Sequence, residues 1–434
     1  MLGFPSSGIV LVIALLFGAG SWFYLYGIFL PFHQSHEQAG VTWNHRSDLY
    51  PRWVGTRELL LNGRNPYGAE VTREIEMGYY GRPADEAKAT APRDEQRFIY
   101  PLFVVFLFAP TVLMPFSSLQ VGGWIILFVV TLAALPLWTM AAGWRYSARE
   151  LFVGGALVLG SWPVAEGLYM GQLSLLVAFF LAVGVAAMAR GWGTAGGMLL
   201  AASLMKPQLS LPLLGWLLIR AACNWRQEKR FLGGFAASAF FLLAGSEALL
   251  PHWFWYWRTS LPAYIAYTGS RSSLERILGP EGGAVAAFVV VGSAGAVCWG
   301  LRKQPVRSGD FFYSVCLVLC VTLLLLPTWL LASYNDVLFI PAILWIWMNR
   351  GELTRTAARK VLALLFGIAL IWGPVAELVL SARVLILRSP VEAESVLSIP
   401  QLFFFVLPVI VLALLLVVRP RAGVEVDLAE VQEG

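Results

Sequence analysis

Apolar stretches as long as a membrane is thick recur along the whole chain, and this repetition limits the fold more than any other feature of the sequence. A helix needs about 20 apolar residues to cross the hydrocarbon core of a bilayer. Only 13% of the 434 residues are charged, against about 25% in an ordinary soluble domain. The sequence therefore predicts an all-α polytopic membrane protein with about twelve transmembrane helices. The candidate spans are 8–30, 98–116, 121–141, 150–169, 172–189, 194–219, 231–250, 283–301, 311–332, 336–348, 361–381 and 400–418.

Basic residues indicate which loops face the cytoplasm. Four basic clusters, each separated from the next by two spans, lie at 220–230, 301–307, 349–360 and 419–421. The positive-inside rule places all four in the cytoplasm. We therefore expect a multi-pass protein of the cell inner (cytoplasmic) membrane with both termini inside. Three polar segments face outward: 31–97, 251–282 and 382–399.

The first half of this topology contains a conflict. Strict alternation of the spans places Arg145 and Arg149 outside and Gln172 inside, against the charge rule. Shallow or re-entrant helices between 98 and 219 would reverse these assignments.

The chain is expected to form one transmembrane domain over 1–434, since the apolar runs continue from end to end. The long first loop, 31–97, is too charged for a span, and "TREIEMGYYGR" within it predicts a short surface helix. The tail at 419–434 is acidic and is expected in the cytoplasm. The net charge of +5 comes from scattered loop residues, so nucleic acid is not an expected partner.

Ionisable residues within spans are costly and suggest function. They are Glu166, Lys206, Glu247, Asp336 and Glu377. Lys206 precedes Pro207, which breaks or kinks a helix. A buried ammonium beside a broken helix suits an anion such as phosphate; the alternative is a snorkelling or paired structural lysine.

The stretch "NHRSDLYPRW" places Asp48 between arginines just beyond the first span. Asp48 could be a solvated loop carboxylate or the N-cap of the helix that follows. Near a low-dielectric surface, with Arg52 close by, it could instead act as a general base toward a hydroxyl.

Other polar residues at the outward face also have two interpretations. Arg258 and Arg271 lie in an aromatic segment typical of a membrane interface, yet arginine is also suited to a lipid phosphate. Asn335 and Asp336 could form a turn or bind sugar hydroxyls. Gln172 stands at a predicted helix start. No nucleotide-binding, metal-ligand or nucleophile-elbow motif is recognised, so neither a metal nor a cofactor is expected.

Five segments occur in the order and spacing of a known family. They are "SDLYPRW", "ELLLNGRNPYG", "FIYPLFVVFLFAPTVLMPF", "GQLSLLVAFFLAVG" with "AGGMLLAASLMKPQLSLPLL", and "LLPTWLLASYNDVLFIPAI". Together, over roughly 40–350, they resemble the family 87 glycosyltransferases of the GT-C superfamily. The family's "YPP" is "YPL" here, and "SYND" stands where some relatives have histidine.

This resemblance implies an inverting membrane glycosyltransferase that takes mannose or arabinofuranose from a polyprenyl-phosphate donor. The acceptor would be a lipid- or glycan-linked hydroxyl, and the active site would face the extracytoplasmic side. Asp48 would be the base and Lys206 the lysine of the family's "KP" motif. We expect Lys206, Arg258, Arg271 and Arg52 to bind the donor phosphate. The expected sugar or acceptor contacts are Tyr50, Gln172, Asn335 and Asp336. Two alternatives are a carrier or flippase of lipid-linked sugars and a non-catalytic membrane subunit.

Overall fold

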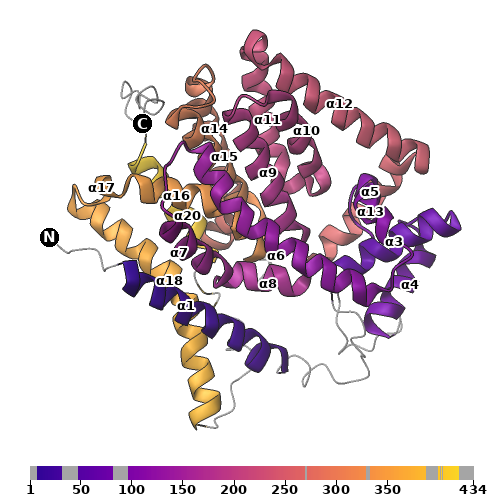
Figure 1. Ribbon diagram of the computed structural model, residues 1–434, viewed down its shortest axis with the longest axis horizontal. Coiled ribbons are helices and arrows are strands. Elements are labelled where there is room, and N and C mark those ends of the chain that lie inside the picture. The colour runs from indigo at the N-terminus through magenta and orange to yellow at the C-terminus, as the bar shows by residue number, and fades with distance from the viewer. Residues whose placement is uncertain are drawn as a thin grey trace.

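The computed structural model is a bundle of helices, as Figure 1 shows. It describes residues 7–31, 47–81, 96–268, 271–328, 333–387, 399, 400, 402 and 404–419. The two short described strands, β1 (Arg271–Ser272) and β2 (Pro327–Thr328), pair in antiparallel fashion. Lipid offers the backbone no hydrogen bonds, so apolar segments fold as helices that satisfy their own. The predicted all-α class is confirmed.

The helical elements follow the apolar runs. In chain order they are α1 (Ser7–Tyr24) with the π-helical η1 (Leu25–Phe29), α3 (Leu49–Asn62), α4 (Ala69–Tyr80), η3 (Leu102–Val104), α5 (Val105–Phe108), η4 (Ala109–Thr111), α6 (Phe116–Ala141), α7 (Ala148–Leu159), α8 (Trp162–Met170), α9 (Leu173–Ala189), α10 (Gly193–Ala202), η5 (Ser203–Met205), α11 (Pro207–Cys223), α12 (Trp225–Leu249), α13 (Trp253–Thr268), α14 (Ser273–Leu301), α15 (Gly309–Leu325), η6 (Ser333–Phe339), α16 (Ile340–Met348), α17 (Arg350–Leu353), α18 (Ala357–Leu387) and α20 (Leu407–Val417).

Five of the described helices are long and apolar enough to cross a membrane: Gly8–Phe29, Phe116–Ala141, Trp225–Leu249, Ser273–Leu301 and Ala357–Ile386. A sixth span arises if α7 and α8, which meet at an angle of 63°, are counted as one. Large apolar side chains on these helices face outward, such as Phe240 at 73% exposure and Phe288 at 82%. The length and apolar surface of these helices indicate a membrane protein.

The predicted span at 98–116 is wrong. The described helices there, η3, α5 and η4, cover only Leu102–Thr111, which is about 15 Å of helix and half of a membrane core. Both ends of this segment lie beside α3. The Arg52 guanidinium lies 4.3 Å from the centre of the Tyr100 ring, and Trp53 Nε1 donates to the Thr111 carbonyl at 3.1 Å. The segment thus returns to the side from which it came.

The predicted single span at 194–219 is also wrong, because the segment enters and leaves at one end of the bundle. Gly193, where α10 begins, and Arg226, just after α11, line one pocket. We call this the Arg226 end. Between them the chain reverses at Lys206, which contacts Gln172 at the start of α9. We call the end that holds Lys206, Gln172 and Asp48 the Asp48 end.

These two corrections remove the conflict in the predicted topology. Gln172 donates a hydrogen bond to Asp48, so the two residues lie on the same side. Strict alternation, which placed them on opposite sides, fails in this region. Re-entrant helices between 98 and 219 are the arrangement that the charge rule favours for Arg145 and Arg149.

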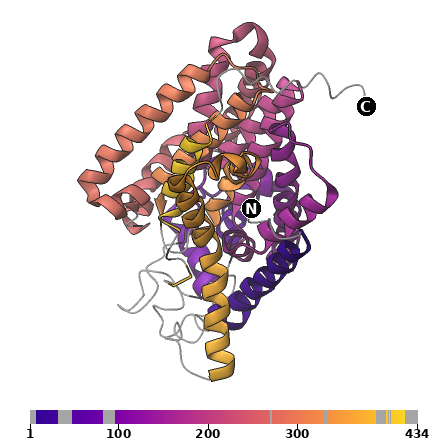
Figure 2. The ribbon, with the colours of Figure 1, turned by 90° about the vertical axis from the view of Figure 1, so that its left-hand side faces the viewer.

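Helix α9 forms the centre of the bundle, and most of its residues are buried. Helices α10 and α12 pack closely against each other, and α10 covers one side of α9. A Cβ added to Gly197 of α10 would lie 2.2 Å from the carbonyl oxygen of Phe231 in α12. A Cβ added to Gly234 of α12 would lie 2.2 Å from the carbonyl oxygen of Thr194 in α10. Small residues permit such contact between membrane helices. Figure 2 shows the long α18 extending beyond the rest of the bundle.

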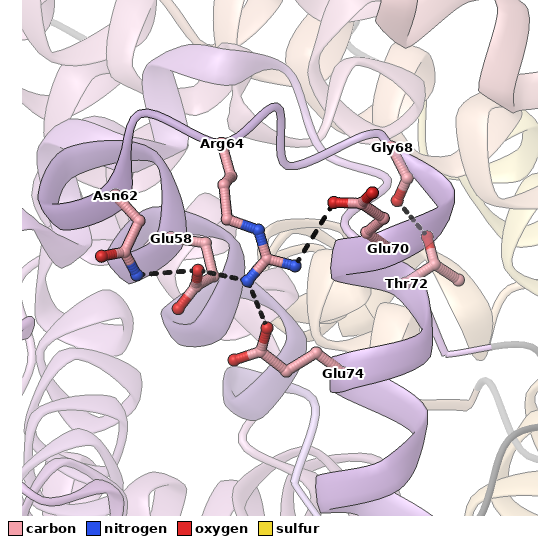
Figure 3. Close-up of polar contacts among 7 residues, drawn as sticks. All are labelled: Glu58, Asn62, Arg64, Gly68, Glu70, Thr72 and Glu74. Atoms are coloured by element: carbon pink, nitrogen blue, oxygen red, sulfur yellow. Dashed lines mark hydrogen bonds and ion pairs between the residues drawn. The ribbon is translucent and has the colours of Figure 1, made fainter.

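A helical hairpin, α3 and α4, carries Asp48 at its start and lies at one side of the molecule (Figure 1). Arg64, in the connecting turn, joins the two helices through ion pairs of 2.7 Å to both Glu58 and Glu74 (Figure 3). Glu70 lies 3.9 Å away. Helix α4 covers most of the stretch for which the sequence predicts a short helix in the first loop.

Candidate functional site

Asp48 stands directly before α3, but its side chain does not cap this described helix. Ser47 takes that role, since its Oγ accepts from the Leu49 N–H at 3.3 Å. The backbone N–H of Asp48 donates to the Met170 carbonyl at 2.7 Å. This bond ties the start of α3 to the end of α8. The Asp48 carboxylate is thereby directed toward the α8–α9 turn and away from the α3 backbone.

Gln172 bridges the acid and the lysine. Its Nε2 donates to Asp48 Oδ2, and its Oε1 accepts from Lys206 Nζ at 2.9 Å. The preceding Gly171 has φ +68°, a conformation that favours glycine. A Cβ on Gly171 would lie 2.7 Å from Ser47 Oγ. The turn can approach Asp48 this closely because residue 171 lacks a side chain.

Lys206 occupies the break between α10 and α11. Pro207 begins α11, and Lys206 itself adopts a non-helical conformation with φ −124° and ψ 82°. The side chain is buried, with 7% exposure. Its ammonium donates to Gln172 Oε1 and, at 2.7 Å, to Ser174 Oγ. Ser174 Oγ in turn donates to Asn335 Oδ1 at 2.8 Å.

The charge of Lys206 is not neutralised by these bonds. Both of its hydrogen-bonding partners within the described residues are neutral oxygens, and an ammonium has three donors. The position adds to the positive potential, since Lys206 caps the N-terminal end of α11, where the helix dipole is also positive. The Tyr334 ring, 5.0 Å away, supplies only a weak counter-charge. The Asp48 carboxylate lies on the other side of Gln172 and is the acid whose charge interacts with Lys206; a bound anion would be a second, direct partner.

Arg52 adds a second cation. Its Nη1 donates to the Asp48 carbonyl at 2.6 Å, and its guanidinium lies over Tyr100. Burial raises the pKa of Asp48 above its usual value, while the charges of Arg52 and Lys206 draw it back down. Asp48 thus combines a stronger affinity for protons with a cationic surrounding.

A second acid cluster lies beside this network. Ser333 Oγ donates to Glu166 Oε2. Among the described residues, Asp336 Oδ2 and Glu166 Oε1 are buried without a hydrogen-bond partner. Because the 333–336 segment also supplies Asn335 to the lysine network, both clusters belong to the Asp48 end. Two buried acceptors without partners would suit the hydroxyls of a bound sugar.

The structure brings together Asp48, Arg52, Gln172, Lys206 and Asn335, all named from the sequence. They come from four separate parts of the chain. Three other predicted residues lie elsewhere. Tyr50 packs on Phe116, with ring centres 4.9 Å apart, and its hydroxyl lies against Gly78 of α4.

The two arginines of the predicted 251–282 loop are exposed. Arg258 lies on α13, over the Trp255 ring at 5.7 Å. Arg271 is in β1, paired with Thr328 of β2. Helix α13 borders the site, since Trp257 donates to the Ile99 carbonyl, next to Tyr100, at 2.8 Å. The structure joins neither arginine to the Lys206 network by a hydrogen bond between described residues.

Sequence reasoning did not single out Ser174, Tyr100, Tyr334 or Ser333. Ser174 gave one weak signal, since it follows Gln172 by two residues at a helix start. The remaining three contact residues that the sequence did name: Tyr100 contacts Arg52, Tyr334 contacts Lys206, and Ser333 bonds to Glu166. Glu377, by contrast, accepts a hydrogen bond from Ser21 and joins α18 to α1. Glu247 is exposed and accepts from the His252 N–H at 2.7 Å, near the end of α12.

Comparison with protein-family models, with curated proteins and with solved structures gave no match. Within the part of the chain that the structure describes, no group of three or more His, Cys, Asp or Glu side chains is placed to hold a metal ion. The arrangement therefore has to be interpreted from its own chemistry: an acid of raised pKa, two cations and several neutral hydrogen-bonding groups.

Proposed function

We propose that this protein is a membrane glycosyltransferase that moves a sugar from a polyprenyl-phosphate donor to a lipid- or glycan-linked hydroxyl. The observation that carries this proposal is the continuous chain of contacts Asp48–Gln172–Lys206–Ser174–Asn335. It joins a base, a buried cation and sugar-binding groups, which are the parts such a transfer needs. The resemblance to family 87 glycosyltransferases names the same acid and lysine.

Asp48 acts as the general base. The acceptor oxygen attacks the anomeric carbon from the face opposite the phosphate, while its proton passes to the Asp48 carboxylate. The bond between the anomeric carbon and the phosphate oxygen breaks, and its electron pair leaves with the polyprenyl phosphate. The product has the inverted configuration. The raised pKa of Asp48 makes its carboxylate a better proton acceptor than an ordinary aspartate.

Lys206 and Arg52 stabilise the leaving phosphate. Negative charge grows on the phosphate as the glycosidic bond breaks, so fixed cations lower the barrier most in the transition state. Lys206 is suited to binding the leaving phosphate because its described hydrogen-bonding partners are neutral. The positive N-terminal end of the α11 dipole also lies at Lys206. Arg258 and Arg271 would contact the donor phosphate at the entrance. Gln172, Asn335 and Asp336 are the proposed sugar or acceptor contacts, and Tyr50, which packs toward α4, is left out of this set.

The proposed topology keeps about twelve crossings in a GT-C-like bundle but distributes them differently. The segment 98–116 does not cross, and α10 and α11 each cross, one up and one down. The four basic clusters then lie in the cytoplasm and the Asp48 end outside the inner membrane. A lipid donor in the outer leaflet has its phosphate at headgroup height, which is the height at which a site at this end would lie.

A transfer assay tests the proposal. Purified full-length protein is incubated with radiolabelled polyprenyl-phosphate mannose and, separately, with the arabinofuranose donor, together with membrane lipid extract as acceptor. We expect wild type to form a labelled product and Asp48→Asn to lose about 100-fold or more of that rate. Asp310→Asn, the same change at the start of α15, is the matched control and should stay close to wild type.

The alternatives give different results in the same material. Equal rates for wild type and Asp48→Asn would show that the base assignment is wrong. Movement of the labelled donor across vesicles without a new glycosidic bond would identify a carrier. Co-purification of a stoichiometric partner, together with tolerance of Lys206→Ala, would identify a structural subunit.

A further inference from the structure

The pocket at the Arg226 end lies far along the bundle from the proposed active site. It has a volume of about 390 Å³ and lies between the α9–α10 turn, the first turns of α12 and the α14–α15 loop. Gly191 and Gly193 form one wall, Val306 another, and Arg226, Lys229 and Arg230 a third. The three basic side chains are exposed, so they are available to a ligand.

The charge of this pocket is strongly positive. Its one acid, Glu228, is neutralised by Arg220, whose Nη1 lies 2.6 Å from Glu228 Oε1. Arg307 adds a further cation beside Gly191: its Nε donates to the Ala189 carbonyl at 2.7 Å. Its Nη2 lies 3.5 Å from the Cβ position of Gly191. The pocket thus has four cations whose charges are not balanced by the lining acid.

Two helices also begin at the pocket. Helix α10 starts at Gly193 and α12 at Trp225, and the side chain of the residue before each makes no capping hydrogen bond within these described helices. The first N–H groups of a helix lack partners inside it and favour an anion. Basic side chains and helix N-termini together favour a phosphate group.

Two tryptophans place the pocket at the membrane interface. Trp192 immediately precedes Gly193 and is 67% exposed, while Trp225 immediately precedes Arg226 and is 62% exposed. Exposed tryptophan is enriched at the boundary between lipid and water. From the same first turn, α12 continues along an outward apolar face that includes Phe240 and Phe241. A headgroup in the pocket would leave acyl chains beside this face.

We propose that the pocket between α10 and α12 binds the phosphate of an anionic phospholipid. The pocket supplies the charge, the helix termini supply hydrogen bonds, and the flanking tryptophans and the apolar face of α12 favour a lipid over a soluble phosphate. The proposal does not depend on the reaction at the Asp48 end.

Lipid retention by the full-length protein tests this site. Wild type is reconstituted in mixed phosphatidylglycerol and phosphatidylcholine, extracted, and the lipids that remain bound are counted by native mass spectrometry. The test variant is Arg226→Gln/Arg230→Gln. The control, Arg350→Gln/Lys360→Gln, removes two positive charges from exposed positions in another basic loop. Circular dichroism and gel filtration establish that both variants fold.

We expect wild type to retain phosphatidylglycerol in preference to phosphatidylcholine and the control to do the same. Each basic residue near anionic lipid contributes about 1 kcal/mol, so the test variant should bind phosphatidylglycerol about tenfold or more weakly. Unchanged retention by the folded test variant would overturn the proposal, and so would an equal loss in the control. Displacement of the lipid by millimolar inorganic phosphate in wild type would show that the site takes a soluble anion and would overturn the assignment to lipid.

Discussion

Helix α11 has a buried cation at each end, and the two differ in their partners. Arg220, in the last turn, is 2% exposed, binds Glu228 at 2.6 Å and donates to the Gln304 carbonyl at 2.8 Å. Its charge also matches the negative end of the helix dipole. Lys206, at the first turn, binds neutral oxygens and lies at the positive end. A buried cation bonded directly to an acid holds a fold together, whereas one whose direct partners are neutral oxygens, with Asp48 acting on it only from beyond Gln172, is suited to a ligand.

The largest effect should come from replacing these two cations by methionine. Lys206→Met removes the proposed phosphate contact, and we expect kcat/KM to fall about 100-fold or more. Its Tm should stay the same or rise, because a costly buried charge is removed. Arg220→Met leaves Glu228 buried without its partner, so we expect a clear loss of Tm and folded yield. Rates per folded molecule should change little.

Transfer assays and thermal unfolding of both variants in the same detergent measure this contrast. If Lys206→Met lost stability as Arg220→Met does, while the rate per folded molecule remained, Lys206 would be a structural residue and the comparison would fail.

The Gly171 turn, which presents Gln172 to Lys206, should give the next largest effect. Gly171→Ala places a Cβ 2.7 Å from Ser47 Oγ in a backbone with φ +68°. Either the turn or the start of α3 must move, and we expect about tenfold lower kcat/KM, since small displacements of catalytic groups are costly. Gly143→Ala is the control: it has the same positive φ, +66°, but open space around it. Equal activity in the two variants would show that the close approach is not needed.

Removing the charge of Arg52 should change the pH dependence of the reaction. Asp48 acts as a base only when deprotonated, and Arg52 lowers its pKa. In Arg52→Gln the pKa of Asp48 should rise, so the acid limb of kcat/KM should move to higher pH. Arg57→Gln removes an exposed arginine from the same helix and should leave the limb in place. If the acid limb did not move in Arg52→Gln, Asp48 would not be the group whose titration sets the limb.

The smallest effect should come from Arg64, a paired cation that is only partly buried. Its ion pairs with Glu58 and Glu74 join α3 to α4 (Figure 3). Water screens the pair with the exposed Glu74, and the buried Glu58 keeps a hydrogen bond from Asn62 Nδ2 at 2.9 Å. We expect Arg64→Gln to lower Tm slightly and to keep activity within about twofold of wild type. A large loss of activity would mean that the α3–α4 hairpin positions Asp48 more strongly than its hydrogen bond to Met170 does.

The sequence was sufficient to predict the fold class, because apolar length and scattered charge depend only on composition along the chain. It also singled out Asp48, Gln172, Lys206 and Asn335, since acids, amides and amines near or within spans are uncommon. It offered shallow or re-entrant helices between 98 and 219 as an alternative, but it did not locate the turn within 98–116 or the reversal at Lys206. Hydropathy counts apolar residues, and a re-entrant pair of short helices is as apolar as one long span.

The partners of each site residue also could not be predicted from the sequence. Tyr50 and Arg52 are neighbours on one helix, yet Tyr50 packs toward α4 while Arg52 lies over Tyr100. Ser174 is an ordinary serine until the fold places it between Lys206 and Asn335. These contacts join residues that are distant along the chain, 32 positions for Ser174 and Lys206 and 161 positions for Ser174 and Asn335, and a single sequence contains no direct signal for them.

The order of the site residues along the chain has a consequence for biosynthesis. Glu166, Gln172, Ser174 and Lys206 leave the ribosome well before Ser333 and Asn335, which later provide Glu166 and Ser174 with hydrogen-bonding partners. During synthesis, the polar groups of the earlier helices enter the bilayer with part of their bonding unmet. The network closes only when η6 and α16 join α9 and α15. A chain whose synthesis is incomplete therefore contains the lysine but not the finished site, and the proposed transferase activity would require the last third of the protein.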